Sequence, residues 1–229
     1  MDIRQTDPGG LRQRLSQVLA ARPLLRGLLR ALGAGGFCFV LAGAGLLDGP
    51  VPLALAPVCV LPFGPAAICA YLGATAGYAV FWGLSAALEP VAAGFLLLAG
   101  SCLLADLVPD EQGWLASAAA GGIYALLGVI FVLRTDGGLQ AALQLILRLV
   151  LLTLSVRMLS PAPANARLRP YAAAVCLLAG LVRVQLPFGV PLAVIPAAAI
   201  CVLAAAGPEA LAVGAACGLV SVSYTHLTL

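Results

Sequence analysis

Long apolar runs separated by short polar turns dominate this sequence, and they restrict the folds that are open to it. Only 9% of its 229 residues are charged, whereas about 25% is usual for a water-soluble domain. With 62% hydrophobic residues and a mean hydropathy of +1.09, the chain cannot cover itself with a polar surface. It must use lipid as its solvent, where backbone groups are satisfied within helices. We therefore predict an all-α fold, a polytopic transmembrane helical bundle.

Polar turns divide the apolar sequence into about eight spans plus a truncated ninth, at roughly twenty residues for a regular span. Clear breaks stand at Asp48-Gly49-Pro50 and at Glu89-Pro90, where we expect loops. The regular spans are predicted at residues 27–47, 66–84, 91–108, 113–133, 139–158, 171–184 and 188–206, and the truncated one at 210–221. Together they form a multi-span membrane domain over residues 27–221.

The stretch 51–65 is apolar but is broken by four prolines, so it is either a short distorted span or a re-entrant segment. Arginine counts separate the two readings, because arginine is enriched on the cytoplasmic side. A short span puts nine arginines on the side of the N-terminus and two on the other, and a re-entrant segment gives eight and three. We take the short span and a cytoplasmic N-terminus.

The two ends of the sequence differ from the apolar core. Residues 1–26 form a basic cytoplasmic leader, read either as an amphipathic helix on the membrane surface or as a plain positive flank. Residues 222–229, Val-Ser-Tyr-Thr-His-Leu-Thr-Leu, interrupt an apolar run. These eight residues resemble a translated sequencing adapter. We therefore expect 222–229 to be a non-native tail and the natural protein to continue beyond the ninth span.

The sequence contains few side chains arranged as catalytic or ligand-binding groups usually are. Its single histidine, His226, lies in the tail, so no catalytic Ser/His/Asp or Cys/His set is formed. The seven cysteines lie in apolar runs without a CxxC pair, as small buried hydrophobes do. Asp106, Asp110 and Glu111 are read as a solvated turn, and no Gly-rich phosphate loop is present. We predict no catalytic, cofactor-binding or metal-binding residue and, since the net charge is only +3, no nucleic-acid partner.

Three polar side chains recur at near-helical spacing in the segment 139–158: Gln140, Gln144 and Arg148. They are either a polar face packed on another helix or at the membrane interface, or part of a transport path, since intramembrane charges are functional candidates. Two GxxxG pairs are candidate helix-packing sites, although a chain this rich in glycine also produces such pairs by chance. They are Gly73 with Gly77 and Gly214 with Gly218.

The order of segments resembles a known membrane region. An Arg-rich leader precedes Phe39-Val-Leu-Ala-Gly-Ala-Gly-Leu-Leu-Asp48, which runs into the proline-broken Pro52-Leu-Ala-Leu-Ala-Pro57. The strings Tyr71-Leu-Gly-Ala-Thr-Ala-Gly-Tyr78 and Gly214-Ala-Ala-Cys-Gly-Leu-Val220 follow. Over nearly all of 27–221 the chain resembles the N-terminal membrane region of the stage II sporulation protein E family of spore-forming Firmicutes.

This resemblance implies a localisation role. Members of the family carry about ten spans and a C-terminal PPM-type protein serine phosphatase domain that binds manganese and dephosphorylates an anti-sigma-factor antagonist, activating the forespore sigma factor. None of that domain's catalytic residues lies in this sequence. The resemblance implies a multi-pass protein of the bacterial cytoplasmic membrane at the sporulation septum, with cell-division proteins and further copies of itself as partners. The alternative function is a membrane subunit of a small-solute transporter, which the broken 51–65 stretch favours.

Overall fold

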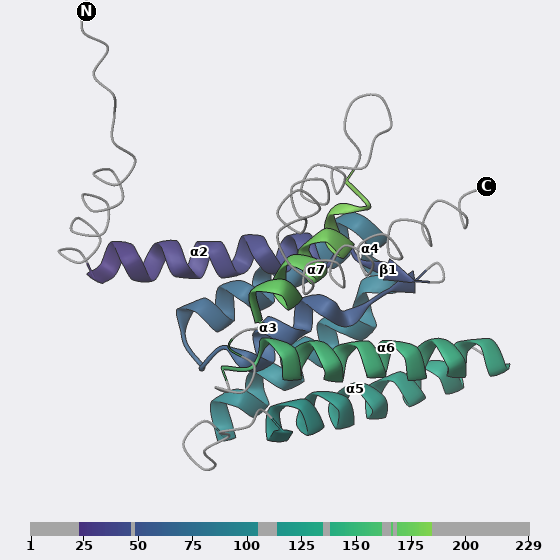
Figure 1. Cartoon of the computed structure of the whole chain (residues 1–229). Coiled ribbons are helices and arrows are strands. Elements are labelled where there is room, and N and C mark those ends of the chain that lie inside the picture. The colour runs from purple at the N-terminus through teal and green to yellow at the C-terminus, as the bar shows by residue number, and fades with distance from the viewer. Residues whose placement is uncertain are drawn as a thin grey trace, which may run out of the picture.

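The computed structural model describes residues 23–46, 49–104, 114–134, 138–161, 166 and 169–184 (Figure 1). These residues are almost entirely helical. The elements are α2 (Pro23–Leu41), β1 (Gly45–Leu46), β2 (Gly49–Pro50), the 3-10 helix η1 (Pro52–Ala54), α3 (Leu55–Val60), α4 (Pro65–Leu104), α5 (Trp114–Arg134), α6 (Gly138–Leu159) and α7 (Arg169–Leu181).

In the described part of the chain, four helices are long and apolar enough to cross a membrane: α2, α4, α5 and α6. The shorter apolar helix α7 falls in the predicted span 171–184. The helical membrane class is therefore as predicted. The predicted spans at 188–206 and 210–221, the tail 222–229 and most of the leader 1–26 lie outside the described residues; α2 already begins within the leader, at Pro23.

Helix α4 corrects the predicted loop at Glu89-Pro90. A straight helix of 40 residues would be about 60 Å long, twice the thickness of about 30 Å that a bilayer core has. The helix instead breaks at Gly83, whose φ of 79° and ψ of 164° suit glycine. Its halves fold back on each other, which is shown by the hydrogen bond of 3.4 Å that the Tyr71 hydroxyl donates to the Val91 carbonyl, 20 residues later. Glu89 and Pro90 thus lie inside the second half of the helix.

The predicted span 27–47 also ends earlier than expected. Helix α2 stops at Leu41, and β1 and β2 pair antiparallel as a short ribbon, with Gly45 opposite Pro50. The backbone turns into the ribbon just after the helix, where the Val51 amide donates to the Ala44 carbonyl at 3.0 Å. Gly43 lies so close to α7 that a Cβ there would stand 2.6 Å from the Gly180 carbonyl oxygen. A residue larger than glycine would not fit at this position.

Helix α2 and the first half of α4 run parallel. Their contacts follow the same order along both helices: Gly35 with Gly73, Phe39 with Gly77, and Ala42 with Trp82. Two parallel helices joined in sequence require the chain between them to return across the bundle. That return is made by the ribbon, η1 and α3, a unit we call the short crossing segment (residues 45–60).

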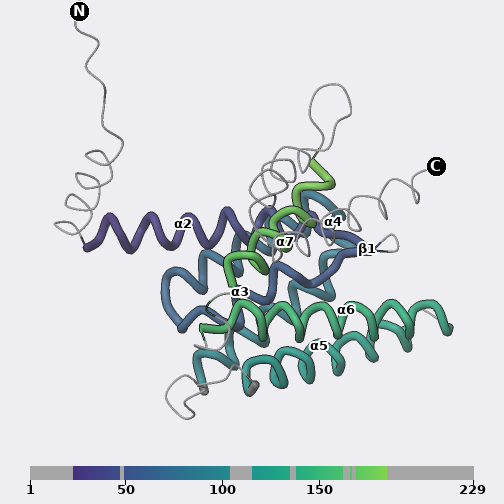
Figure 2. The backbone as a smooth tube through the Cα atoms, viewed as in Figure 1, coloured from purple at the N-terminus to yellow at the C-terminus, as the bar shows by residue number. Residues whose placement is uncertain are grey.

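The short crossing segment is the buried centre of the fold. Residues 51–58 are all buried, and among them Leu55 packs in a core with Leu41, Tyr78, Tyr124 and Leu152 from the surrounding helices. Helices α5 and α6 lie side by side on one flank of this centre (Figure 2). Their outward faces are apolar, with Leu126 65% and Leu139 77% exposed, which suits contact with lipid.

Candidate functional site

The predicted polar stripe of α6 does not form one uniform face. Gln140 is exposed, Gln144 is half-buried, and Arg148, in the middle of the helix, has a side chain only 13% exposed. Because successive four-residue steps turn slowly around a helix, the stripe starts on the outside and ends facing the core. Arg148 is the member that the fold brings into contact with other elements.

Arg148 faces Glu89, from the second half of α4. Its Nη1 lies 3.5 Å from Glu89 Oε2, and the Glu89 side chain is 15% exposed. Glu89 is the only carboxylate side chain in the described part of the chain. An isolated charge in an apolar membrane interior is costly, so these two side chains reduce each other's penalty by pairing.

Two buried tyrosines and one backbone segment complete this site. The Tyr124 hydroxyl of α5 lies near the Glu89 carboxylate. The Tyr78 hydroxyl of α4 donates to the Val51 carbonyl at 3.0 Å, which ties the helix to the short crossing segment. On its other side the Arg148 guanidinium lies against Gly49 of β2, where a Cβ would collide with Nη2. Four elements, α4, α5, α6 and β2, therefore meet around one ion pair.

The site is built around a charge pair of one guanidinium and one carboxylate. Among the described residues no three His, Cys, Asp or Glu side chains gather as metal ligands do. Arg148 Nε is buried without a hydrogen-bond partner in the described structure. A guanidinium that keeps an unused donor beside a carboxylate can hold helices together or contribute to a polar path.

A second cation lies at the end of α7. The Arg183 guanidinium carbon is 3.6 Å from the centre of the Trp82 ring, a cation–π contact. The Trp82 Nε1 donates to the Ala42 carbonyl at 2.9 Å, just past the end of α2. This contact joins three elements where the chain of α4 turns back near Gly83. It serves packing at that end of the bundle, as interfacial tryptophan and arginine often do.

The candidate packing glycines of α4 lie against α2. A Cβ on Gly73 would overlap the Gly35 backbone, and a Cβ on Gly77 would stand 2.5 Å from the Phe39 carbonyl oxygen. Small residues of this kind let two helix backbones approach closely. The other predicted pair, Gly214 and Gly218, lies outside the described residues.

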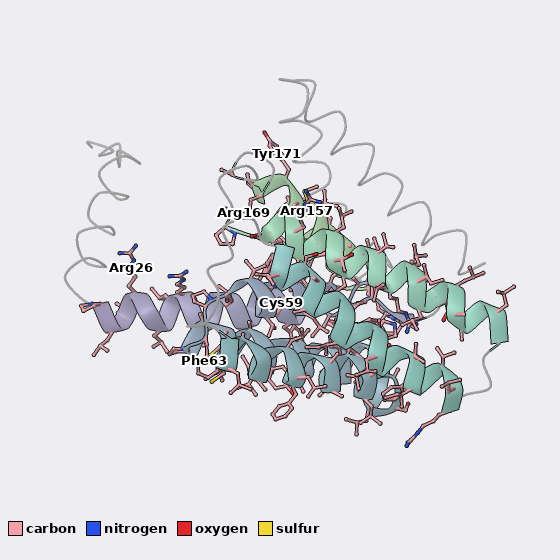
Figure 3. The ribbon with its side chains drawn as sticks, turned by 90° about the horizontal axis from the view of Figure 1, so that it is seen from below. Arg26, Cys59, Phe63, Arg157, Arg169 and Tyr171 are labelled. Atoms are coloured by element: carbon pink, nitrogen blue, oxygen red, sulfur yellow. The ribbon has the colours of Figure 1, made fainter. Side chains whose placement is uncertain are left out.

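Five arginines outside the ion pair lie near helix ends, and Figure 3 labels three of them. Arg26 lies near the start of α2, while Arg157 and Arg169 lie close together where α6 ends and α7 begins. Arg134 ends α5, and Arg183 follows the end of α7. Following the chain in Figure 1 places the start of α2 and the junction of α6 with α7 at the same end.

The sequence did not indicate Glu89 as a site residue, because next to Pro90 it reads as a loop marker. A lone carboxylate within an otherwise apolar stretch was the available signal, since such a charge needs a partner in the membrane. That partner stands 59 positions away. Comparison adds no further guide, since no protein-family model, curated protein or solved structure matches this chain.

Proposed function

We propose that this chain is the membrane anchor and localisation region of a sporulation-specific PPM-type protein serine phosphatase. The observation that supports anchoring is the apolar outward face of the described helices, which includes Leu103, 74% exposed, and Leu133, 75% exposed. Such faces suit lipid, and the charges near the centre of the fold are paired with each other. The phosphatase part of the proposal rests on the sequence resemblance to the stage II sporulation protein E family.

In this proposal the catalysis belongs to a separate domain outside these 229 residues. That domain would bind manganese and dephosphorylate an anti-sigma-factor antagonist, which activates the forespore sigma factor. The membrane region would hold the phosphatase in the cytoplasmic membrane, with a cytoplasmic N-terminus and about eight spans plus part of a ninth. It would gather the protein at the sporulation septum through cell-division proteins and through its own copies.

A localisation experiment tests this role. The chain is fused to a fluorescent protein at its N-terminus and expressed in a spore-forming bacterium at the onset of sporulation. We expect membrane insertion, enrichment at the asymmetric septum and no phosphatase activity of the isolated chain. Even labelling of the whole cell membrane during septation would contradict the localisation role while leaving membrane insertion intact.

The alternative, a membrane subunit of a small-solute transporter, is favoured by one specific observation. The Glu89–Arg148 pair lies beside a short, proline-broken crossing segment, and transporters build substrate sites from broken helices and intramembrane charges. Sequencing the gene from a complete genome separates the two functions. A reading frame that ends soon after the ninth or tenth predicted span, without a soluble domain, would favour the transporter.

A further inference from the structure

The Glu89–Arg148 pair joins two parts of the bundle that the chain builds separately. Glu89 belongs to the helical hairpin of α4, folded at Gly83, and Arg148 belongs to the helical hairpin of α5 and α6. The α5–α6 hairpin has its own internal ties, since the Ser117 hydroxyl donates to the Thr153 carbonyl at 3.0 Å. The ion pair adds a polar tie between the two hairpins.

Apolar packing alone sets the position of these hairpins only weakly. In lipid no hydrophobic driving force favours one helix contact over another, so close packing and polar contacts decide which helices associate. Leu151 of α6 packs on a small cluster formed by Ala44, Val51 and Leu53. That contact is non-directional, whereas a charge pair is satisfied at only one relative position of the helices.

The guanidinium of Arg148 also lies between two elements. One side faces Glu89 at 3.5 Å, and the other lies against the Gly49 backbone of β2. A shift of α6 along its axis would separate Arg148 from Glu89 and from the ribbon together. Both charges would then be left unpaired in apolar surroundings, the costly state for a membrane protein.

We propose that Glu89 and Arg148 form an intramembrane latch that holds the α5–α6 hairpin in register against the short crossing segment. The latch depends on opposite charges at the two positions and not on which residue carries which charge. Removing one charge leaves the other unpaired and releases the hairpin. Exchanging the two charges keeps the pair and keeps the hairpin in place.

Thiol cross-linking in membranes measures this register directly. The full chain, with its seven native cysteines replaced by alanine, carries Val51→Cys and Leu151→Cys, which report contact between the short crossing segment and α6. A second version carries Gly121→Cys and Thr153→Cys, which report contact within the α5–α6 hairpin, because a Cβ on Gly121 lies 2.8 Å from the Thr153 methyl group. Each version is combined with Glu89→Gln, Arg148→Gln or the exchange Glu89→Arg with Arg148→Glu.

We expect each single neutralisation to lower the extent of cross-linking between positions 51 and 151 by about three- to twentyfold, the range that polar contacts between membrane helices span. Cross-linking between positions 121 and 153 should stay unchanged, which shows that the hairpin itself is still formed. The exchange variant should recover cross-linking between 51 and 151 to within about twofold of the starting chain. The matched control Arg134→Gln, which removes an exposed arginine at the end of α5, should change neither pair.

Two outcomes overturn the latch. One is full cross-linking between positions 51 and 151 in both single variants, and the other is an exchange variant no better than the single ones. If the cysteine-free chain does not fold, the same charge variants are compared by thermal unfolding of the chain with its native cysteines in detergent. Single variants should then unfold at lower temperature and the exchange variant near the original temperature, and equal temperatures throughout would refute the proposal.

Discussion

Gly73 of α4 lies so close to Gly35 of α2 that a methyl group on Gly73 would overlap the Gly35 backbone. The two helices run parallel, and the next contact, Gly77 with Phe39, follows one turn later. Between apolar helices in lipid, such close backbone approach supplies much of the packing energy. This contact fixes the direction of α2 against α4, and with it the need for the short crossing segment to return across the bundle.

The first prediction is that Gly73→Ala destabilises the bundle. The added methyl group has no space and must push the two backbones apart, which typically costs about 1–3 kcal/mol. Thermal unfolding of the purified chain in detergent measures the change. Gly100→Ala is the matched control, because Gly100 lies in the same helix with nothing within 4 Å of its Cβ position. That control should be neutral or slightly stabilising, and equal effects of the two changes would refute the packing role of Gly73.

The second prediction is that Tyr78→Phe weakens the hold on the short crossing segment. The change removes the hydrogen bond of 3.0 Å from Tyr78 to the Val51 carbonyl. That carbonyl still accepts a hydrogen bond from the Leu53 amide at 2.8 Å, so it is not left without a partner. We therefore expect a loss of about 1 kcal/mol, the usual net contribution of a hydrogen bond whose remaining partner stays satisfied.

Denaturation in a series of detergent mixtures measures the effect of Tyr78→Phe. The control is Tyr171→Phe, because Tyr171 is exposed at the start of α7 and such a surface change should alter stability by less than about 0.5 kcal/mol. A Tyr78→Phe variant as stable as the original chain would show that the hydroxyl contributes nothing.

The bounds of helices that are flanked by charged residues or glycines were predicted closely from the sequence. The predicted spans 113–133 and 139–158 correspond to α5 at 114–134 and α6 at 138–159. Hydropathy did not reveal that 27–47 contains a helix and a strand, because an apolar stretch has the same hydropathy in either form. It predicted a break between the spans 66–84 and 91–108 but placed it at Glu89-Pro90, because the position of the break at Gly83 depends on backbone geometry and on the contact between the two halves of α4.

The candidate site was predicted only in part, for a physical reason. Arg148 stands out in the sequence, as any charge within a span does. Its partner Glu89 and its neighbour Gly49 lie 59 and 99 positions earlier in the chain. Their meeting depends on how the α4 hairpin, the α5–α6 hairpin and the β1–β2 ribbon pack, and no local pattern of residues encodes that arrangement.

The third prediction is that Gly49→Ala acts through Arg148. The methyl group would occupy the place of the guanidinium. The guanidinium is the end of a flexible side chain, so it would move and loosen the contact with Glu89. We expect a loss of about 1–3 kcal/mol in stability, measured by thermal unfolding. In an Arg148→Ala background the same change should have less than half of this effect, because the obstacle is gone. Equal losses in both backgrounds would show that Gly49 is needed for another reason.

The fourth prediction concerns the sides of the membrane, which follow from the arginines at the two ends of the bundle. Arg26, Arg157 and Arg169 lie toward one end. Arg134 ends α5 and Arg183 follows α7, and both helices run toward the other end. Arginine is retained on the cytoplasmic side during insertion. We therefore expect the leader 1–26 and the loop after α6 to face the cytoplasm.

Reporter fusions at several points along the full chain measure this arrangement. Insertions of a cytoplasm-active reporter before Pro23 and at Ser160 should give signal, and an insertion at 135–137, after Arg134, should give none. An export-active reporter should give the opposite pattern. The result depends on the short crossing segment: if residues 45–60 returned to the side from which they came, the leader and the loop after α6 would lie on opposite sides. Different reporter signals at these two points would mean that the short crossing segment does not cross the membrane. That result would contradict the structure, because the parallel course of α2 and the first half of α4 requires a crossing between them.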